Sequence, residues 1–262
     1  MEVVIVGCPD AGGALVGGAV AALVRSRPGA VLGLATGSSP LAVYRDLARR
    51  HAGGEVSFGA ARAFLLDEYV GLAPDHPQSY RAFVADRLER HVDFAPGAVR
   101  GPEAAGDGAD LAAACAAYEA AIAAVGGVDL QLLGVGTDGH IAFNEPGSSL
   151  ASRTRIKTLT DQTRRDNARF FRRPEDVPRH VVTQGVGTIL DARHLVLLAF
   201  GDAKADAVAR AVEGPVTAMV PASALQLHPH VTVVVDEPAA AGLALTDYYR
   251  EAWRHKPPWQ GL

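Results

Sequence analysis

Cysteine is scarce in this chain of 262 residues, which has only Cys8 and Cys115. Neither cysteine lies in a C-x-x-C pair or in the spacing of a zinc site, so the sequence predicts two reduced thiols in a cytoplasmic protein. An excess of one charge is also lacking, because the formal net charge is −4. We therefore expect no nucleic-acid partner and no membrane partner, and an anionic ligand must be met by a local group of cations.

Long apolar runs are missing as well. The nearest candidate is GGALVGGAVAALV at residues 12–24, which is too short to span a bilayer. It follows Asp10 and has no basic leader, so it makes a poor signal peptide, and an Ala- and Gly-rich helix packed on a sheet fits it better. The remaining composition, 48% hydrophobic and 21% charged, predicts a globular fold with a sizeable core.

Strand-like and helix-like segments alternate along the chain. Apolar strands are expected at residues 2–6, 31–35, 61–69, 128–135, 194–200 and 230–237, with helices between them. This order predicts one α/β domain over residues 1–262, with a mostly parallel sheet covered by helices on both faces. Residues 158–182 differ, because they are polar and rich in arginine, and we expect them to form a mobile flap inserted between elements of the sheet.

Three polar loops follow expected strands. They are ATGSSP at residues 35–40, DEYVG at residues 67–71 and GTDGHIAFNEP at residues 136–146. Ligands of open α/β sheets bind beyond the carboxyl ends of the strands. The sequence therefore places its ligand site at these loops.

The third loop begins with a G-x-G-x-x-G pattern formed by Gly134, Gly136 and Gly139. A dinucleotide site needs this pattern to be followed by a long helix and by a second strand that ends in an acidic residue. Here NEP at residues 144–146 interrupts the segment, and the region where the acidic residue is required reads RTRIKTL. The context of a dinucleotide site is missing, so no dinucleotide cofactor is expected.

The same loop carries acid–base groups. Asp138 and His140 are two residues apart, and Glu145 follows a short apolar patch. A carboxylate beside an imidazole fixes its tautomer, and a second carboxylate raises its basicity. Taken singly, Asp138 suits a turn, His140 a partly buried position and Glu145 a solvated one. Their grouping at the end of one strand indicates catalysis.

Two carboxylates, Asp67 and Glu68, end another apolar strand. One of them suits a capping role and the other a solvent-facing position. A carboxylate at this strand end also suits a general base, which is the functional interpretation.

Two helix starts suit an anionic ligand. The turn at Gly37, Ser38 and Ser39 offers backbone N–H groups and two hydroxyls, with Ser39 expected as the N-cap and Pro40 as the first helical residue. The simpler interpretation of this turn is capping alone. Lys204 is expected in the first turn of another helix, where a cation opposes the helix dipole and a bound phosphate would offset that cost.

Most of the chain, from residue 32 to residue 238, resembles the glucosamine-6-phosphate deaminase family. The matching blocks include DEYVGL, HPQSY, GVGTDGHIAFNEPGSSLASRTRIKTLT, GVGTILDA and LQLHPH, while the family usually has Asn where Thr137 stands. The resemblance implies conversion of D-glucosamine 6-phosphate and water to D-fructose 6-phosphate and ammonia, with no metal and no organic cofactor. It also implies a three-layer α/β sandwich with a Rossmann-like, mostly parallel sheet of the sugar-phosphate isomerase type.

The resemblance gives roles to the candidate residues. It implies that His140 helps to open the pyranose ring, with Asp138 and Glu145 as its carboxylate partners, and that Asp67 moves a proton between C2 and C1. The residues that match substrate-phosphate contacts are Gly37, Ser38, Ser39, Arg169 and Lys204. Because Arg169 lies in the expected flap, we expect the flap to close over the substrate.

Regulation is implied as well. In SRTRIKT, the cations Arg153, Arg155 and Lys157 share one face if the segment is extended. The simpler interpretation is a charged strand edge that discourages pairing between molecules. Some members of the family are hexamers of two trimers activated by N-acetylglucosamine 6-phosphate, and Ser148, Arg155 and Lys157 match their activator-phosphate contacts. We therefore expect a homo-oligomer, with a hexamer favoured.

Two other functions are alternatives to this one. A 6-phosphogluconolactonase-like hydrolase shares the G-x-D-G-H loop, but that family lacks the FNEP continuation present at residues 143–146. A sugar-phosphate sensor without catalysis would keep Arg169 and Lys204 and lose the acid–base residues, all of which are present here.

Overall fold

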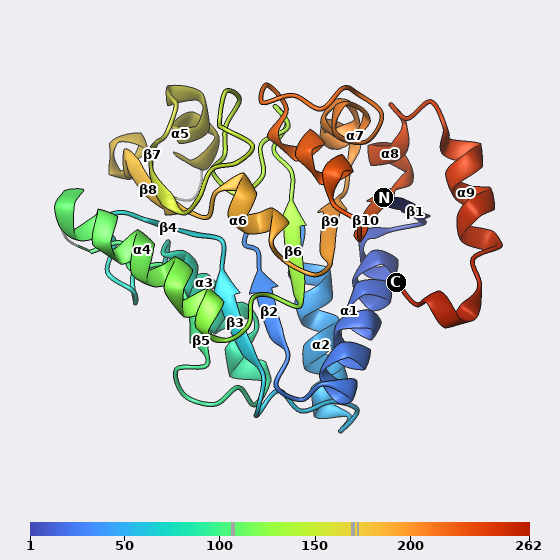
Figure 1. Ribbon diagram of the computed structural model, residues 1–262, viewed down its shortest axis with the longest axis horizontal. Coiled ribbons are helices and arrows are strands. Elements are labelled where there is room, and N and C mark those ends of the chain that lie inside the picture. Colours follow the sequence, from blue (N-terminus) through green and yellow to red (C-terminus); the bar gives the residue numbers. More distant parts are fainter. Residues whose placement is uncertain (106–107, 169–170, 172) are drawn as a thin grey trace.

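The computed structural model describes residues 1–262 except 106, 107, 169, 170 and 172. Its centre is a sheet in which every pair of neighbouring strands runs parallel (Figure 1). In spatial order the strands are β1 (Glu2–Val6), β10 (Val231–Asp236), β9 (Leu195–Ala199), β6 (Leu130–Gly134), β2 (Val31–Leu34), β3 (Arg62–Leu65) and β5 (Val99–Arg100). The expected parallel sheet is confirmed.

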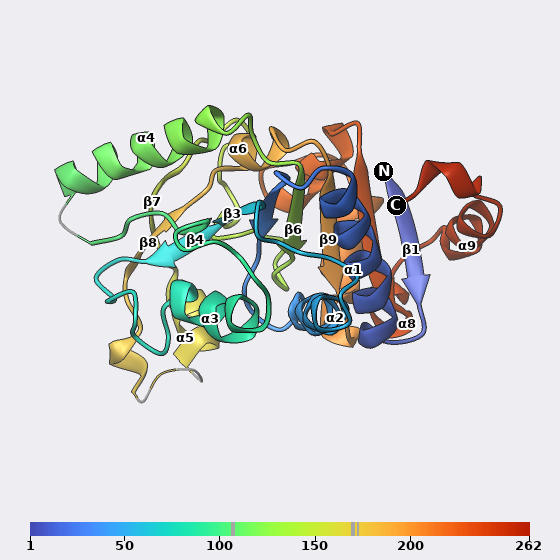
Figure 2. The same cartoon turned by 90° about the horizontal axis from the view of Figure 1, so that it is seen from below.

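Helices cover both faces of this sheet. The α-helices are α1 (Pro9–Ser26), α2 (Leu41–Ala52), α3 (Tyr80–Arg87), α4 (Gly108–Ala124), α5 (Asp161–Asn167), α6 (Val186–Leu190), α7 (Ala205–Val212), α8 (Glu237–Ala240) and α9 (Thr246–Arg254). Short 3-10 helices span Glu89–His91, Pro174–Asp176, Asp202–Lys204, Pro221–Leu227 and Pro258–Gln260. Figure 2 shows α4 and α6 on the opposite side of the sheet from α2 and α3, which makes the expected three-layer sandwich.

The central strands are continuous apolar runs because helices on both faces exclude water from them. Every residue of β9 (LVLLA) and of β10 (VTVVVD) is buried. The segment at residues 12–24 lies within α1, the helix packed on the sheet that its composition predicted. In the part of the chain that the structure describes, no helix combines the length and the apolar character needed to cross a membrane.

A second, smaller sheet was not anticipated as a separate unit. It is antiparallel and consists of β4 (Asp67–Tyr69), β8 (His180–Thr183) and β7 (Arg155–Thr158), with β8 in the middle. Its strands are three or four residues long and partly polar, so they carry too little of the period-two pattern for recognition from sequence. Residues 159–179, the greater part of the expected flap, connect β7 to β8, and Thr158 pairs with His180 where the connection begins and ends.

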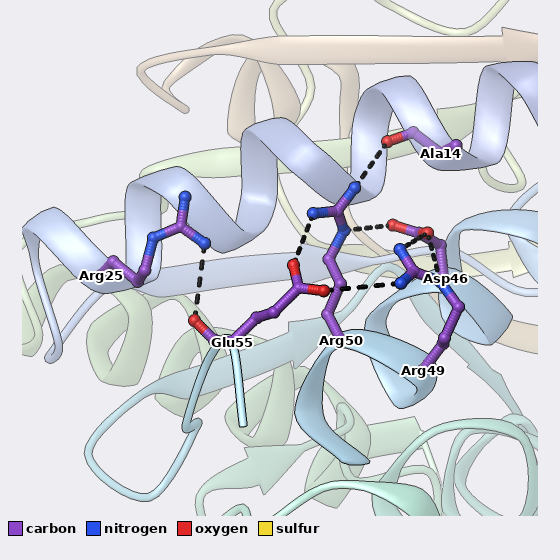
Figure 3. Close-up of polar contacts among 6 residues, drawn as sticks. All are labelled: Ala14, Arg25, Asp46, Arg49, Arg50 and Glu55. Atoms are coloured by element: carbon purple, nitrogen blue, oxygen red, sulfur yellow. Dashed lines mark hydrogen bonds and ion pairs between the residues drawn. The ribbon is translucent and has the colours of Figure 1, made fainter. Parts of the chain in front are cut away.

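A charged network fastens α1 to α2, the helix that follows the ATGSSP loop (Figure 3). Asp46 is 8% exposed and accepts hydrogen bonds from Arg49 at 2.7 Å and Arg50 at 2.5 Å. Arg50 also reaches Glu55 at 2.9 Å, while Gly17 of α1 lies so close that a Cβ there would overlap the Asp46 carboxylate. Arg50 also donates to the Ala14 carbonyl of α1 at 3.5 Å, and Arg25 of α1 donates to the Glu55 carbonyl at 3.5 Å, so the network links the two helices.

Candidate active site

The candidate site lies where the connections of the parallel sheet change direction. From β2 the chain continues to β3 and β5 on one side, whereas from β6 it continues to β9 and β10 on the other. Open α/β sheets bind ligands at the carboxyl ends of the strands at such a point. Ser39 after β2 lies beside the end of β6, since a Cβ on Gly134 would be 3.5 Å from the Ser39 hydroxyl oxygen. The structure therefore brings the first and third predicted loops together.

The imidazole of His140 and the carboxylate of Asp138 form a close pair in the third loop. Nδ1 of His140 lies 2.6 Å from Oδ1 of Asp138, and the His140 backbone N–H donates to the same oxygen at 3.1 Å. Interaction with His140 lowers the pKa of Asp138 to about 2, against the opposing effect of partial burial. Asp138 is therefore a carboxylate at neutral pH and lies within ion-pair distance of Nδ1, although the angle of this contact is outside the range of a hydrogen bond.

Two glycines shape this pair. Gly139, between Asp138 and His140, has φ of +89°, a conformation that side chains with a Cβ rarely adopt. Gly136 faces the His140 ring so closely that a Cβ there would overlap the imidazole. The glycines that resembled a dinucleotide pattern thus fold the acid–base loop itself, and turns rather than a helix follow them.

Glu145 is buried, with 5% of its surface exposed, so the solvated position weighed for it from the sequence is wrong. Its Oε1 accepts hydrogen bonds from the Thr160 hydroxyl at 3.2 Å and from the Thr163 hydroxyl. Thr160 is also the N-cap of α5, because its hydroxyl accepts the Thr163 N–H at 3.1 Å. Glu145 therefore fastens the acid–base loop to the start of the segment between β7 and β8.

Asp67 and Glu68 have different environments at the end of β3. Glu68 accepts the backbone N–H groups of Tyr80 at 3.0 Å and Arg81 at 2.8 Å, so it caps α3 as one of the two carboxylates was expected to do. Asp67 is only 5% exposed, so the solvent-facing alternative is wrong. Burial, and secondly the charge of Glu68, raise the pKa of Asp67 well above its usual value. A buried carboxyl with a raised pKa suits a general base.

The turn at Gly37, Ser38 and Ser39 does not cap α2 in the way the sequence suggested. The helix begins at Leu41, with Pro40 in the N-cap position and no side-chain capping bond. Gly37 has φ of +82°, which turns the chain so that the Leu41 N–H meets the Ser38 carbonyl at 3.3 Å. Neither serine hydroxyl is needed for the cap, and the turn stands at the carboxyl end of β2.

Lys204 stands at the matching end of β9, the strand next to β6. It is the last residue of the 3-10 helix Asp202–Lys204 and directly precedes α7, close to its expected place in the first turn. Loops after β2, β6 and β9 thus share one edge of the sheet, because parallel neighbours end on the same side. Arg169, the other predicted phosphate contact, lies outside the described residues.

Comparison with known proteins agrees with this geometry. The sequence model of the family described as glucosamine-6-phosphate isomerases/6-phosphogluconolactonase matches residues 10–234. This chain belongs to that family. It is 62% identical over 263 residues to the glucosamine-6-phosphate deaminase of Mycolicibacterium smegmatis and 60% identical over 263 residues to that of Streptomyces coelicolor, with both chains fully covered in each case.

Solved structures of the isomerase/lactonase family have the same fold. A monomeric glucosamine-6-phosphate deaminase of the NagB superfamily superposes with a TM-score of 0.88 at 41% identity, covering 92% of this chain and 100% of that one. The 6-phosphogluconolactonase of Trypanosoma brucei gives 0.74 at 21% identity, covering 93% and 98%. The second likeness concerns the fold alone.

The residues matched to the family's activator contacts lie in and near the second sheet. Arg155 and Lys157 are in β7, which is an edge strand, as the charged-edge interpretation requires. Ser148 is buried, and its hydroxyl has no hydrogen-bond partner among the described residues. Arg153 precedes the strand and pairs instead with Glu119 at 2.5 Å and with Asp191 at 2.6 Å, so the expected row of three cations is reduced to two.

Some residues that contact the acid–base loop and the strand of Asp67 were not identified from the sequence. Thr160 and Thr163 bind Glu145, while Thr183 and Gln184 lie between β4 and the acid–base loop. The last two interrupt an otherwise apolar run, VVTQGVG, and a buried polar pair in such a strand was the available signal. No three His, Cys, Asp or Glu side chains among the described residues are grouped as they would be around a metal ion.

Proposed function

We propose that this protein converts D-glucosamine 6-phosphate and water to D-fructose 6-phosphate and ammonia. The observation that carries the proposal is a buried Asp67 of raised pKa on the same sheet edge as the Asp138–His140 pair. Full-length relatives at about 60% identity that bear the name of this deaminase support the same reaction.

Each chemical step is a proton transfer or an addition of water, so carboxylates and an imidazole suffice. His140, oriented by Asp138, assists opening of the pyranose ring, and Glu145 is the second carboxylate partner of that step. Asp67 removes the proton from the amine-bearing C2 to give an enolamine. Reprotonation at C1 gives an imine, and water then releases ammonia. The catalytic set is therefore Asp67, Asp138, His140 and Glu145.

A comparison of two substrates tests the proposal. The purified protein is expected to release ammonia from glucosamine 6-phosphate and to leave 6-phosphogluconolactone at its spontaneous rate of hydrolysis. Rapid hydrolysis of the lactone with no ammonia release would assign the chain to the lactonases. Binding of glucosamine 6-phosphate without turnover would make the protein a sensor.

The substrate phosphate is placed at Gly37, Ser38, Ser39, Arg169 and Lys204, where the loops after β2 and β9 supply backbone N–H groups, hydroxyls and a cation. Arg169 belongs to the connection between β7 and β8, so its contact with the phosphate would involve that connection. Within one domain of residues 1–262, residues 158–182 then act as the flap that closes over the substrate.

Replacing Lys204 by alanine is expected to lower kcat/KM about 10–150-fold, because a charged hydrogen bond of about 1.5–3 kcal/mol is lost. Steady-state kinetics with glucosamine 6-phosphate provide the measurement. The control is Lys256→Ala, which is expected to leave kcat/KM unchanged. Lys256 forms an ion pair with Glu2 at 2.5 Å and is not part of the proposed phosphate site. Wild-type kinetics in the Lys204 variant would place the phosphate elsewhere.

Regulation and assembly are proposed as the family resemblance implies, in a cytoplasmic homo-oligomer with a hexamer favoured. N-acetylglucosamine 6-phosphate would bind through Ser148, Arg155 and Lys157 and favour the active conformation, typically by about 1–3 kcal/mol of coupling. Arg155 is half-buried, and the buried Ser148 hydroxyl has no hydrogen-bond partner in the part of the chain that the structure describes; both support a polar ligand there.

The activator is expected to lower the apparent KM and to flatten a sigmoidal substrate curve. The double variant Arg155→Ala with Lys157→Ala should lose this response and keep its turnover at saturating substrate. Light scattering of the purified protein gives the oligomeric state. A monomer, such as the related deaminase solved as one, with a hyperbolic curve that the activator does not change would contradict the regulatory proposal. The proposed reaction would be unaffected by that result.

A further inference from the structure

We propose that Thr183 and Gln184 are positioning residues that set the distance between Asp67 and the loop carrying His140 and Glu145. The proposal rests on the deaminase function above. Both residues lie at the end of β8 and are buried to 1% exposure or less. They lie between the strand of Asp67 and the acid–base loop, and they form hydrogen bonds with both.

One set of contacts holds the strand of Asp67. Thr183 is the cross-strand partner of Asp67 in the antiparallel pairing of β4 with β8. Side chains of such partners stand on the same face, about 5 Å apart at Cβ. Gln184 donates its backbone N–H to the Leu66 carbonyl at 2.8 Å and its side-chain Nε2 to the Leu65 carbonyl at 3.0 Å. The residues directly before Asp67 are thus fixed to β8 by backbone and side chain together.

A second set of contacts holds the acid–base loop. The Phe143 N–H donates to the Thr183 hydroxyl at 3.2 Å, and Nδ2 of Asn144 donates to the Gln184 carbonyl at 2.8 Å. The Thr183 hydroxyl in turn donates to that carbonyl at 3.2 Å. Phe143 and Asn144 lie between His140 and Glu145, so the bonds hold the middle of the catalytic segment.

The segment at residues 141–144 is strained, and these hydrogen bonds stabilise its conformation. Ala142 has φ of +50°, the only positive value recorded for a described residue other than glycine. This conformation is unfavourable for a residue with a Cβ and persists where the surroundings determine it. The Asn144 side chain also donates to the Ile141 carbonyl at 3.1 Å and closes the turn. Without Thr183, the Phe143 N–H would be buried and unpaired beside this strained residue.

A matched pair of variants separates positioning from packing. Thr183→Val keeps the shape of the side chain and removes the hydroxyl, whereas Thr183→Ser keeps the hydroxyl and removes a methyl group. We expect Thr183→Val to lower kcat for glucosamine 6-phosphate about 10–100-fold, since a small misplacement of catalytic groups has effects of that order. Its KM should stay within about threefold, because the phosphate loops are untouched, and Thr183→Ser should stay within about threefold of wild-type kcat.

Gln184→Met provides the second test and decides the matter if Thr183→Val does not fold. It matches the side-chain length, removes the bond to the Leu65 carbonyl and should likewise lower kcat with little change in KM. Turnover by the wild type with normal kcat in Thr183→Val or in a folded Gln184→Met would overturn the inference and leave the deaminase function standing. Equal losses of kcat in the Val and Ser variants would show that Thr183 acts through packing and would also overturn the inference. A wild type without turnover would overturn function and inference together.

Discussion

Replacing Asp67 by asparagine is expected to lower kcat about 10²–10⁴-fold, the usual contribution of a general base, and to raise the melting temperature at the same time. The two effects have one cause. Asparagine keeps the shape of the side chain but cannot take the C2 proton. It also removes a carboxylate that is 5% exposed and whose charged form is disfavoured by burial and by Glu68.

The stability effect has a defined pH dependence. Burial, with a smaller contribution from Glu68, raises the pKa of Asp67 in the folded protein above its unfolded value of about 3.9. The folded state therefore binds more protons than the unfolded state in that window, and the wild type loses stability as pH rises from about 4 towards the folded pKa. The advantage of Asp67→Asn in melting temperature should grow over the same range.

Kinetic and thermal measurements on both proteins from pH 4 upward test this prediction. The kcat of the wild type should rise with pH as Asp67 loses its proton, since only the carboxylate is a base. A variant that keeps turnover and solvent-proton exchange into the product would show that Asp67 is not the base. A lowered melting temperature with lost activity would show instead that Asp67 stabilises the fold.

Replacing Gly136 by alanine is expected to lower kcat/KM about 10²–10³-fold, although Gly136 has no reactive group. The new Cβ would overlap the His140 ring, so the imidazole must turn away from Asp138, from which it is now separated by 2.6 Å. Displacement forfeits most of the acid–base contribution of His140, which is worth about 10²–10⁴-fold in such enzymes. The melting temperature should change less than the activity, because the substitution adds one methyl group beside a side chain that is 26% exposed.

The control is Gly29→Ala, where a Cβ would meet no atom within 4 Å at the other end of the sheet. It should have wild-type kinetics. If Gly136→Ala is equally active, the imidazole does not need its observed position. If it unfolds, Gly136 serves the fold, and the effect on His140 is secondary.

The sheet and its ligand edge followed from the sequence because their signals are local. Continuous apolar runs such as VLLA in β9 predict buried parallel strands, and the polar loops that end them must gather at one edge. The order of the strands did not follow from the sequence, because it depends on contacts between distant segments. Asp67, Asp138 and His140 follow these apolar runs, so the sequence predicts that they lie at that edge.

Burial and long-range partners did not follow from the sequence. Nothing local in DEYVG shows that Glu68 caps α3 while Asp67 is enclosed. The cap depends on a helix 12 residues later along the chain, and Asp67 pairs with a strand more than 100 residues away. Glu145 looks solvated before a proline until Thr160 and Thr163 are placed against it. Serine is a common N-cap residue, which favours Ser39, but the turn at Gly37 makes the helix begin at Leu41 with Pro40 as its N-cap.

The second sheet was missed for the same reason. Its middle strand pairs residues near position 183 with residues near 67 on one side and near 155 on the other, and no periodicity over three or four residues reveals such a pairing. The contacts of Thr183 and Gln184 depend on that pairing, so they became visible only with the structure.

The most direct test of the account is a proton NMR time course of glucosamine 6-phosphate with the wild-type protein in EDTA and without added nucleotide. The account predicts one fructose 6-phosphate and one ammonium ion for each substrate consumed, at a rate that EDTA does not change. Unaltered substrate, or turnover that returns only when a divalent ion is supplied, would contradict it.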